Sequence, residues 1–235
     1  MTKVKNPKRK SIVVFTGAGI SAESGIGTFR DSGGLWEKYK IEDVATPEAF
    51  NKNPSLVLEF YNIRREELIK KSPNIAHISL NKLQNKFDLH IITQNIDDLH
   101  ERSGSENVLH LHGKLREAKS TITNKIYKIE GSKLNIGDLC KDGSQLRPNV
   151  VWFGEEVPNM DIAQELVKKA DIFIIIGTSL NVYPAASLIH YANNAEKIIL
   201  IDPNPSNHNN IEIIQEKATR SVPILVDELL KSIQK

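Results

Sequence analysis

The chain has almost no cysteine, since Cys140 is the only one among its 235 residues. A single thiol excludes an internal disulfide bond and any zinc site built from several thiolates. Long apolar runs are also missing: none approaches the roughly 20 residues that a membrane-spanning helix needs, and no leader-like apolar segment follows the N-terminus. Charge of one sign is not in excess, because the formal net charge is +2. We therefore expect a cytoplasmic protein that binds neither nucleic acids nor membranes.

The rest of the composition is ordinary for a globular protein, with 40% hydrophobic and 26% charged residues. The length suffices for one large core, or for one core with a small inserted lobe. Residues 1–10 are locally basic, and we interpret them as a solvated, flexible N-terminus.

Apolar runs alternate with segments of helical periodicity along most of the chain. We expect buried strands over 11–15, 87–93, 108–111, 150–154, 171–176 and 197–201. We expect helices over 54–71, 75–86, 160–170, 184–194 and 222–233, after a short helix opened by Thr46 and Pro47. This alternation predicts an α/β fold, a Rossmann-like parallel sheet with helices on both faces.

Residues 114–147 break the alternation. They are polar, lack clear periodicity, and contain turn signals near Gly131 and Gly143. We interpret them as a small, weakly cored insert, which leaves 11–113 and 148–235 as the Rossmann-type domain.

Small or polar residues follow four of the expected strands. These segments are Gly17-Ala18-Gly19, Gln94-Asn95-Ile96-Asp97, Gly177-Thr178-Ser179 and Asp202-Pro203-Asn204. Ligands of parallel sheets bind beyond the carboxyl ends of the strands, and glycines let backbone amides approach a pyrophosphate. The pattern therefore predicts a dinucleotide site.

That site differs from the site of a dehydrogenase. A hydride-transferring Rossmann domain has an acidic residue at the end of its second strand, roughly 20 residues after the glycines. Here the corresponding residues, 31–41, have the pattern of a loop and a helix, and the second strand arrives only near residue 90.

Five blocks, in order over nearly the whole chain, resemble the sirtuins, the NAD-dependent protein-lysine deacylases. They are 17–30 (Gly-Ala-Gly-Ile-Ser-Ala-Glu-Ser-Gly-Ile with Thr-Phe-Arg), 93–97 (Thr-Gln-Asn-Ile-Asp), 110–113 (His-Leu-His-Gly), 147–155 (Arg-Pro to Phe-Gly-Glu) and 177–180 (Gly-Thr-Ser-Leu). The resemblance implies acyl-lysine proteins or peptides as partners and NAD as a consumed co-substrate. The implied products are nicotinamide, O-acyl-ADP-ribose and free lysine.

The resemblance also implies roles for individual residues. His112 becomes the catalytic base, which suits an imidazole whose pKa lies near the working pH. Asn95 and Asp97 hold the nicotinamide ribose and carboxamide, and Gln94 a ribose hydroxyl. The remaining cofactor contacts are Gly17, Ala18, Gly19, Ser21, Ala22, Thr28, Phe29, Arg30, Trp36, Ile96, Gly177, Thr178, Ser179, Asp202, Pro203, Asn204 and Ala218. Val151, Phe153 and Gly154 resemble the strand that pairs with the substrate peptide.

Tyr61 and Arg64 lie three residues apart in an expected helix and so share one face. They resemble the Tyr-x-x-Arg signature of sirtuins that remove acidic acyl groups. A guanidinium grips a carboxylate with two hydrogen bonds, and a phenol donates a third. The implied substrates are succinyl- and malonyl-lysine, with acetyl-lysine as a further one.

Sirtuins usually carry four zinc-binding cysteines in the insert, and this chain has only Cys140 there. We therefore predict no zinc.

Three alternatives to deacylation stay open at this point. One is a sensor of NAD or ADP-ribose, the second an enzyme that cleaves NAD or transfers ADP-ribose, and the third a metal-assisted hydrolase using His110 and His112 with Asp97, Asp98 and His100.

Overall fold

The structure, a computed structural model, describes residues 9–27, 38–206 and 210–233. Its main sheet contains six strands: β1 (Ser11–Thr16), β2 (Asp88–Thr93), β3 (Val108–His110), β7 (Ile172–Ile176), β8 (Lys197–Ile201) and β9 (Glu212–Ile214). Their order is β3-β2-β1-β7-β8-β9, and each neighbouring pair is parallel. The expected parallel sheet is confirmed, with β9 as a short edge strand that the sequence did not reveal.

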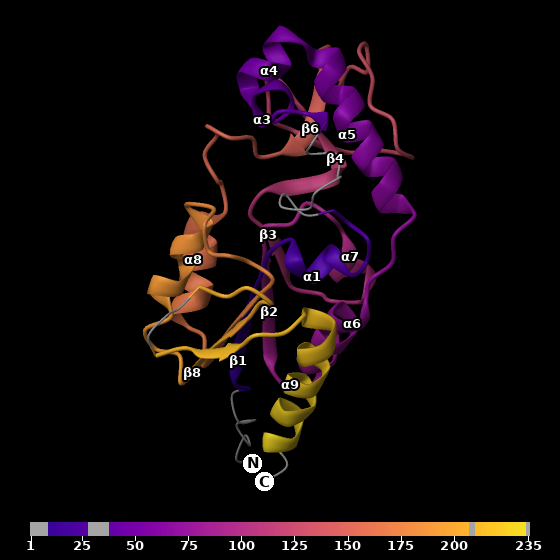
Figure 1. The fold of residues 1–235 in the computed structure, drawn as a ribbon. Coiled ribbons are helices and arrows are strands. Elements are labelled where there is room, and N and C mark those ends of the chain that lie inside the picture. Colours follow the sequence, from indigo (N-terminus) through magenta and orange to yellow (C-terminus); the bar gives the residue numbers. More distant parts are fainter. Residues whose placement is uncertain (1–8, 28–37, 207–209, 234–235) are drawn as a thin grey trace, which may run out of the picture.

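Helices cover both faces of this sheet (Figure 1). One face packs against α6 (Ile75–Lys82) and α9 (Ala218–Ser232), and the other against α8 (Met160–Lys168) and the 3₁₀ helix η2 (Ala185–Tyr191). In β1, Ile12 and Val14 face the first layer, whereas Val13 and Phe15 face the second. All four are fully buried, which explains why a strand covered on both faces is apolar throughout.

Three helix boundaries differ from expectation. Helix α9 begins at Ala218, four residues before Val222, so that Pro223 stands inside the helix rather than at its start. Helix α6 stops at Lys82 and continues as a 3₁₀ turn, Leu83–Asn85. The expected α-helix over 184–194 is the shorter 3₁₀ helix η2. Among the described residues, no helix is long and apolar enough to span a membrane.

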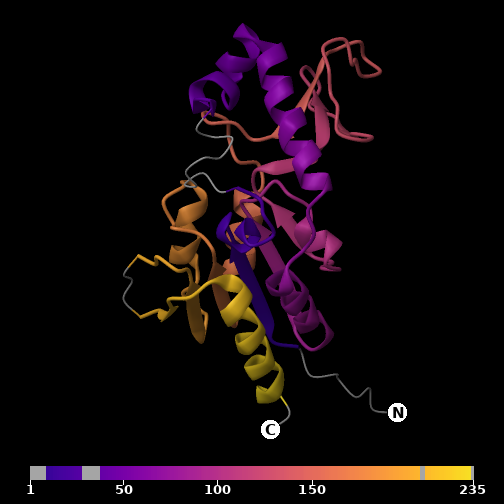
Figure 2. The same ribbon diagram turned by 45° about the vertical axis from the view of Figure 1, so that its right-hand side comes forward.

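A second lobe lies beyond the carboxyl ends of the main sheet (Figures 1 and 2). It combines α3 (Ile41–Val44), α4 (Pro47–Lys52) and α5 (Pro54–Ile69) with an antiparallel sheet of order β5-β4-β6. The strands are β4 (Gly113–Ser120), β5 (Ile126–Lys128) and β6 (Leu146–Val150).

The insert, which we expect to be weakly cored, shares its core with α5. Leu115, Ala118, Ile129 and Leu134 of the insert are buried in one cluster with Val57, Leu58, Phe60 and Tyr61 of α5 and with Trp152. The insert therefore gains its core from helices that precede it by more than 40 residues in the chain.

The expected strand over 150–154 is also wrong, because β6 ends at Val150. The chain then turns: the backbone amide of Trp152 donates to Glu155 Oε2 at 2.8 Å, and Gly154 has a φ of +91°. A left-handed residue of this kind ends a regular strand.

Candidate functional site

The ends of four parallel strands meet at one edge of the main sheet. Thr16 is in register with both Thr93 and Ile176, and Ile176 is in register with Ile201. The four polar segments that begin at residues 17, 94, 177 and 202 therefore leave the sheet side by side. In a parallel sheet this edge is where ligands bind.

Gly17 and Gly19 are required by close packing against Gly177. A Cβ built on Gly19 would lie 2.6 Å from Gly177 Cα, and one on Gly17 would lie 2.7 Å from Gly177 O. The amide of Gly17 donates to Ile176 O at 3.0 Å, and that of Gly19 to Gly177 O at 2.9 Å. We expected these two amides to face a pyrophosphate; instead they tie β1 to β7, and the short helix α1 (Gly19–Ala22) follows directly.

His112 is held as a neutral base. Its Nδ1 lies 3.0 Å from Gln94 O. A carbonyl oxygen only accepts hydrogen bonds, so Nδ1 carries the proton and Nε2 keeps a lone pair. Burial lowers the pKa of His112 from its ordinary 6.5, and the bond to Gln94 offsets part of that shift. At neutral pH, Nε2 is therefore ready to take a proton.

Gly113 fixes the path of the chain after His112. Its φ is +77°, and a Cβ there would lie 2.1 Å from Asn149 O, closer than any side chain allows. The amide of Val151 donates to His112 O at 3.0 Å. The His-Gly pair is thus pressed against the end of β6.

Ser21 joins the two polar residues that follow β2. Its hydroxyl donates to Asp97 Oδ2 at 3.0 Å and accepts from Asn95 Nδ2 at 3.2 Å, and Asn95 Nδ2 also donates to Gly17 O. Burial raises the pKa of Asp97, whereas its bonds to Leu99 N and Ser21 lower it. These contacts bring α1 and residues 94–97 together, as the strand-end pattern predicted.

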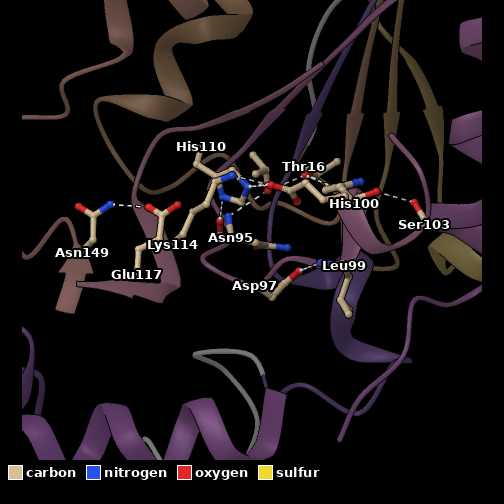
Figure 3. Close-up of polar contacts among 12 residues, drawn as sticks. Thr16, Asn95, Asp97, Leu99, His100, Ser103, His110, Lys114, Glu117 and Asn149 are labelled. Carbon is tan, nitrogen blue, oxygen red and sulfur yellow. Dashed lines mark hydrogen bonds and ion pairs between the residues drawn. The ribbon is translucent and has the colours of Figure 1, made fainter. Parts of the chain in front are cut away.

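Two buried histidines lie behind this edge: His77, which the sequence did not single out, and His100, which it offered only for the metal-hydrolase alternative. His100 Nε2 lies 3.0 Å from Thr16 Oγ1, which donates to Thr93 Oγ1 (Figure 3). The ring of His77 lies 4.9 Å from that of His100. Burial lowers the pKa of His77 to about 4 and that of His100 well below its usual range, so both rings are neutral at neutral pH. Their placement depends on tertiary packing of α6 and α7 (Leu99–Arg102) and has no local sequence signal.

His110 and His112 do not form a metal pair. His110 Nδ1 contacts Asn95 O at 2.9 Å and its Nε2 contacts Glu101 Oε1 at 2.9 Å, as Figure 3 shows in part. Within residues 9–27, 38–206 and 210–233, no three His, Cys, Asp or Glu side chains are placed to hold a metal ion. The metal-hydrolase alternative therefore has no support in this part of the chain.

Tyr61 and Arg64 lie in the second lobe on α5. The Tyr61 side chain is buried, and its hydroxyl accepts a hydrogen bond from Trp152 Nε1 at 3.0 Å. The Arg64 guanidinium is half-buried and packs 5.9 Å from the Tyr61 ring centroid. Burial lowers the pKa of Arg64, and the charges of Tyr61 and Asp97 oppose that shift.

The residues expected to pair with a substrate peptide, Val151, Phe153 and Gly154, lie in a turn rather than a strand. Phe153 is 49% exposed, and its amide donates to Ala45 O at 3.0 Å. The backbone amides of Val151, Trp152 and Phe153 already donate hydrogen bonds within the protein. These amides are therefore not free for the expected pairing with a peptide. The Trp152 carbonyl also accepts from the Glu155 amide at 3.0 Å, and the exposed Phe153 side chain is the part of this turn best placed for contact.

Most of the other predicted cofactor contacts lie within the described residues, and four of them do not. Thr178 donates to Gln94 Oε1 at 3.4 Å, Asp202 accepts from the Asn204 amide, and Ala218 begins α9, which packs against α1. Ala18, Ala22, Ile96, Ser179 and Pro203 also lie on the strand-end segments or on α1. Thr28, Phe29, Arg30 and Trp36 lie outside the described residues.

Comparison with known proteins finds one family throughout. The profile of the Sir2 family matches residues 17–184. The chain is 48% identical over 230 residues to an NAD-dependent protein deacylase of Bacteroides thetaiotaomicron, covering 94% of this chain and 98% of the relative. It is 50% identical over 226 residues to an NAD-dependent protein deacylase of Helicobacter pylori, covering 94% and 96%.

Solved structures agree with the sequence comparison. A mutant of a Sir2 homologue in complex with ADP-ribose superposes with a TM-score of 0.88 at 42% identity, covering 96% of this chain and 94% of that one. A Sir2 homologue in complex with NAD gives 0.85 at 41% identity, covering 95% and 91%. The chain therefore belongs to the Sir2 family.

Proposed function

We propose that this protein removes acyl groups from the lysines of proteins and consumes NAD in doing so. The products are nicotinamide, O-acyl-ADP-ribose and free lysine. The observation that carries the proposal is His112, whose Nδ1 is engaged by Gln94 O and whose Nε2 is left as a neutral acceptor beside the strand-end edge. The names of the relatives, NAD-dependent protein deacylases, support the same conclusion.

The residues at the edge fit NAD. Gln94 Nε2 is buried and has no hydrogen-bond partner among the described residues, while its Oε1 accepts from Thr178. A buried amide donor left unpaired costs about 1–3 kcal/mol, so such a group favours a ligand with acceptor oxygens. A ribose hydroxyl supplies one.

In this proposal, each residue acts through a group that the structure already orients. NAD supplies the ribose carbon that takes the acyl oxygen as nicotinamide leaves. His112 Nε2 removes a proton from a ribose hydroxyl, which is general-base catalysis by a neutral imidazole. Asn95 and Asp97, held by Ser21, orient the carboxamide and ribose of the nicotinamide half.

For the acyl group we propose succinyl- and malonyl-lysine as the preferred substrates, with acetyl-lysine accepted. The Tyr61 hydroxyl accepts a hydrogen bond from Trp152 Nε1, which leaves its own O–H for donation. Arg64 adds a guanidinium on the same helix face. Together they offer three donors to a terminal carboxylate.

The function is tested by incubating the protein with NAD and a panel of acyl-lysine peptides. We expect nicotinamide and O-acyl-ADP-ribose to appear in equal amounts, only when peptide is present, and to be lost in His112→Ala. Nicotinamide release without peptide would instead indicate NAD cleavage or ADP-ribosyl transfer. No release with any peptide would indicate a sensor.

A further inference from the structure

His110, two residues before the proposed base, is buried with both ring nitrogens against hydrogen-bond acceptors. Its side chain is 4% exposed. Nδ1 lies 2.9 Å from the backbone oxygen of Asn95, and Nε2 lies 2.9 Å from Glu101 Oε1 on α7. A neutral imidazole carries only one N–H and can satisfy only one of these two partners.

The position of the protons follows from the partners. The Asn95 carbonyl cannot donate, so Nδ1 must. Glu101 Oε1 already receives Lys114 Nζ at 2.8 Å. Because this oxygen is paired with the Lys114 ammonium, Glu101 is a carboxylate. A carboxylate only accepts hydrogen bonds, so Nε2 must be the donor.

The surrounding charges are compatible with a cation at this place. Glu101 and Lys114 face His110 from α7 and β4, and Asp97 and His100 act on it from the 94–97 segment and from α7. Two of these four, Glu101 and Asp97, are carboxyl groups, and burial keeps His100 uncharged.

We propose that His110 is an imidazolium at neutral pH and is a positioning residue that anchors residues 94–97 to α7. Its Nδ1–H holds the Asn95 carbonyl, and its Nε2–H holds Glu101. The preceding carbonyl, that of Gln94, fixes the tautomer of His112. Two histidines in one His-x-His sequence thus carry opposite protonation states: one a fixed cation, the other a neutral base.

The kinetic consequence rests on the proposed function. The segment that His110 anchors carries the proposed nicotinamide-ribose contacts, so loosening it raises KM for NAD more than it lowers kcat.

The protonation state is tested without activity, by long-range ¹H–¹⁵N NMR of the full, ligand-free chain labelled at histidine. His110→Gln assigns the His110 signals by their disappearance. At pH 7.5 we expect both His110 nitrogens in the protonated range, and one protonated and one unprotonated nitrogen for His112. An unprotonated His110 nitrogen at pH 7.5 overturns the proposal, whatever the enzyme's activity.

Glu101→Gln tests the anchor. Its carboxamide can donate to a neutral imidazole, so His110 should lose a proton at pH 7.5 and the charge-assisted bond becomes a weaker, neutral one. KM for NAD should therefore rise about tenfold with a much smaller change in kcat. Glu106→Gln makes the same chemical change at an exposed position just after α7 and is the matched control. An unchanged KM in Glu101→Gln, or equal changes in both variants, contradicts the positioning role.

Discussion

The hydroxyl of Tyr61 accepts a hydrogen bond from the indole of Trp152 across 91 residues of sequence. This bond joins α5 to the turn that follows β6, both within the core of the second lobe. The Trp152 ring is also covered by the Arg147 guanidinium, 3.3 Å from its centroid, and Arg147 pairs with Glu155. The proposed acyl-recognition helix and the proposed peptide turn are therefore one packed unit.

Tyr61→Phe is expected to destabilise the fold by about 1–3 kcal/mol, because it leaves the buried Trp152 N–H without an acceptor. Urea unfolding followed by tryptophan fluorescence measures the loss. Tyr183→Phe, at a side chain that is 69% exposed, is the control and should be neutral. Equal stability of the two variants would show that the Tyr61 bond contributes nothing.

Arg64→Met should lower kcat/KM for succinyl-lysine peptides by about 10- to 100-fold, the usual worth of a lost hydrogen bond to a charged group. Deacetylation should fall far less, since an acetyl group has no carboxylate. Arg64→Lys keeps the charge without the two-pronged geometry and should give an intermediate loss. Parallel losses on both substrates would argue against recognition of the acyl carboxylate by Arg64.

The activity should decline on the acidic side with an apparent pKa below 6.5. Burial lowers the pKa of His112, so the base stays neutral until the pH falls below the ordinary histidine range and only then loses its lone pair. This acidic decline is measured as the pH dependence of kcat/KM for the peptide at saturating NAD. His112→Ala should remove about 10²- to 10⁴-fold of the rate at neutral pH. A limb centred above 6.5 would be inconsistent with the buried, Gln94-bound ring.

Arg65→Met should destabilise the second lobe by about 3 kcal/mol or more, because it leaves several buried acceptors unpaired. The fully buried guanidinium donates to Leu115 O, Ser132 O and Asn62 Oδ1, each at 2.8 Å. Arg220→Met removes an exposed arginine and is the matched control. Thermal unfolding measures both variants.

The same experiment tests the predicted absence of zinc. If internal bonds such as those of Arg65 hold the insert, a chelator should leave the Tm of the wild-type protein unchanged, and elemental analysis should find no stoichiometric zinc. A Tm that falls with chelator would show that a metal contributes after all.

Local periodicity was enough to predict the main sheet, because strands such as β1 and β7 are buried on both faces and are apolar throughout. It was not enough for the second lobe. Leu115 and Ala118 find their partners on α5, far back in the chain, and residues 114–147 alone therefore show no core.

Some features of the candidate site could likewise be predicted from the sequence, and others could not. Gln94, Asn95 and Asp97 could be predicted, because strand ends in a parallel sheet share one edge. The contact of His110 with Glu101 could not, because it depends on where α7 is placed against β3. The bonded amides of Gly17 and Gly19 also escaped prediction, since sequence shows that glycine is needed but not which neighbour needs it.

The interlock of Gly17 and Gly19 with Gly177 has a thermodynamic consequence. Because these backbones already contact each other, this part of the edge loses its conformational entropy during folding rather than during ligand binding. Preorganisation of this kind spares association the cost of ordering flexible groups. Binding a dinucleotide here therefore does not have to order these three glycines.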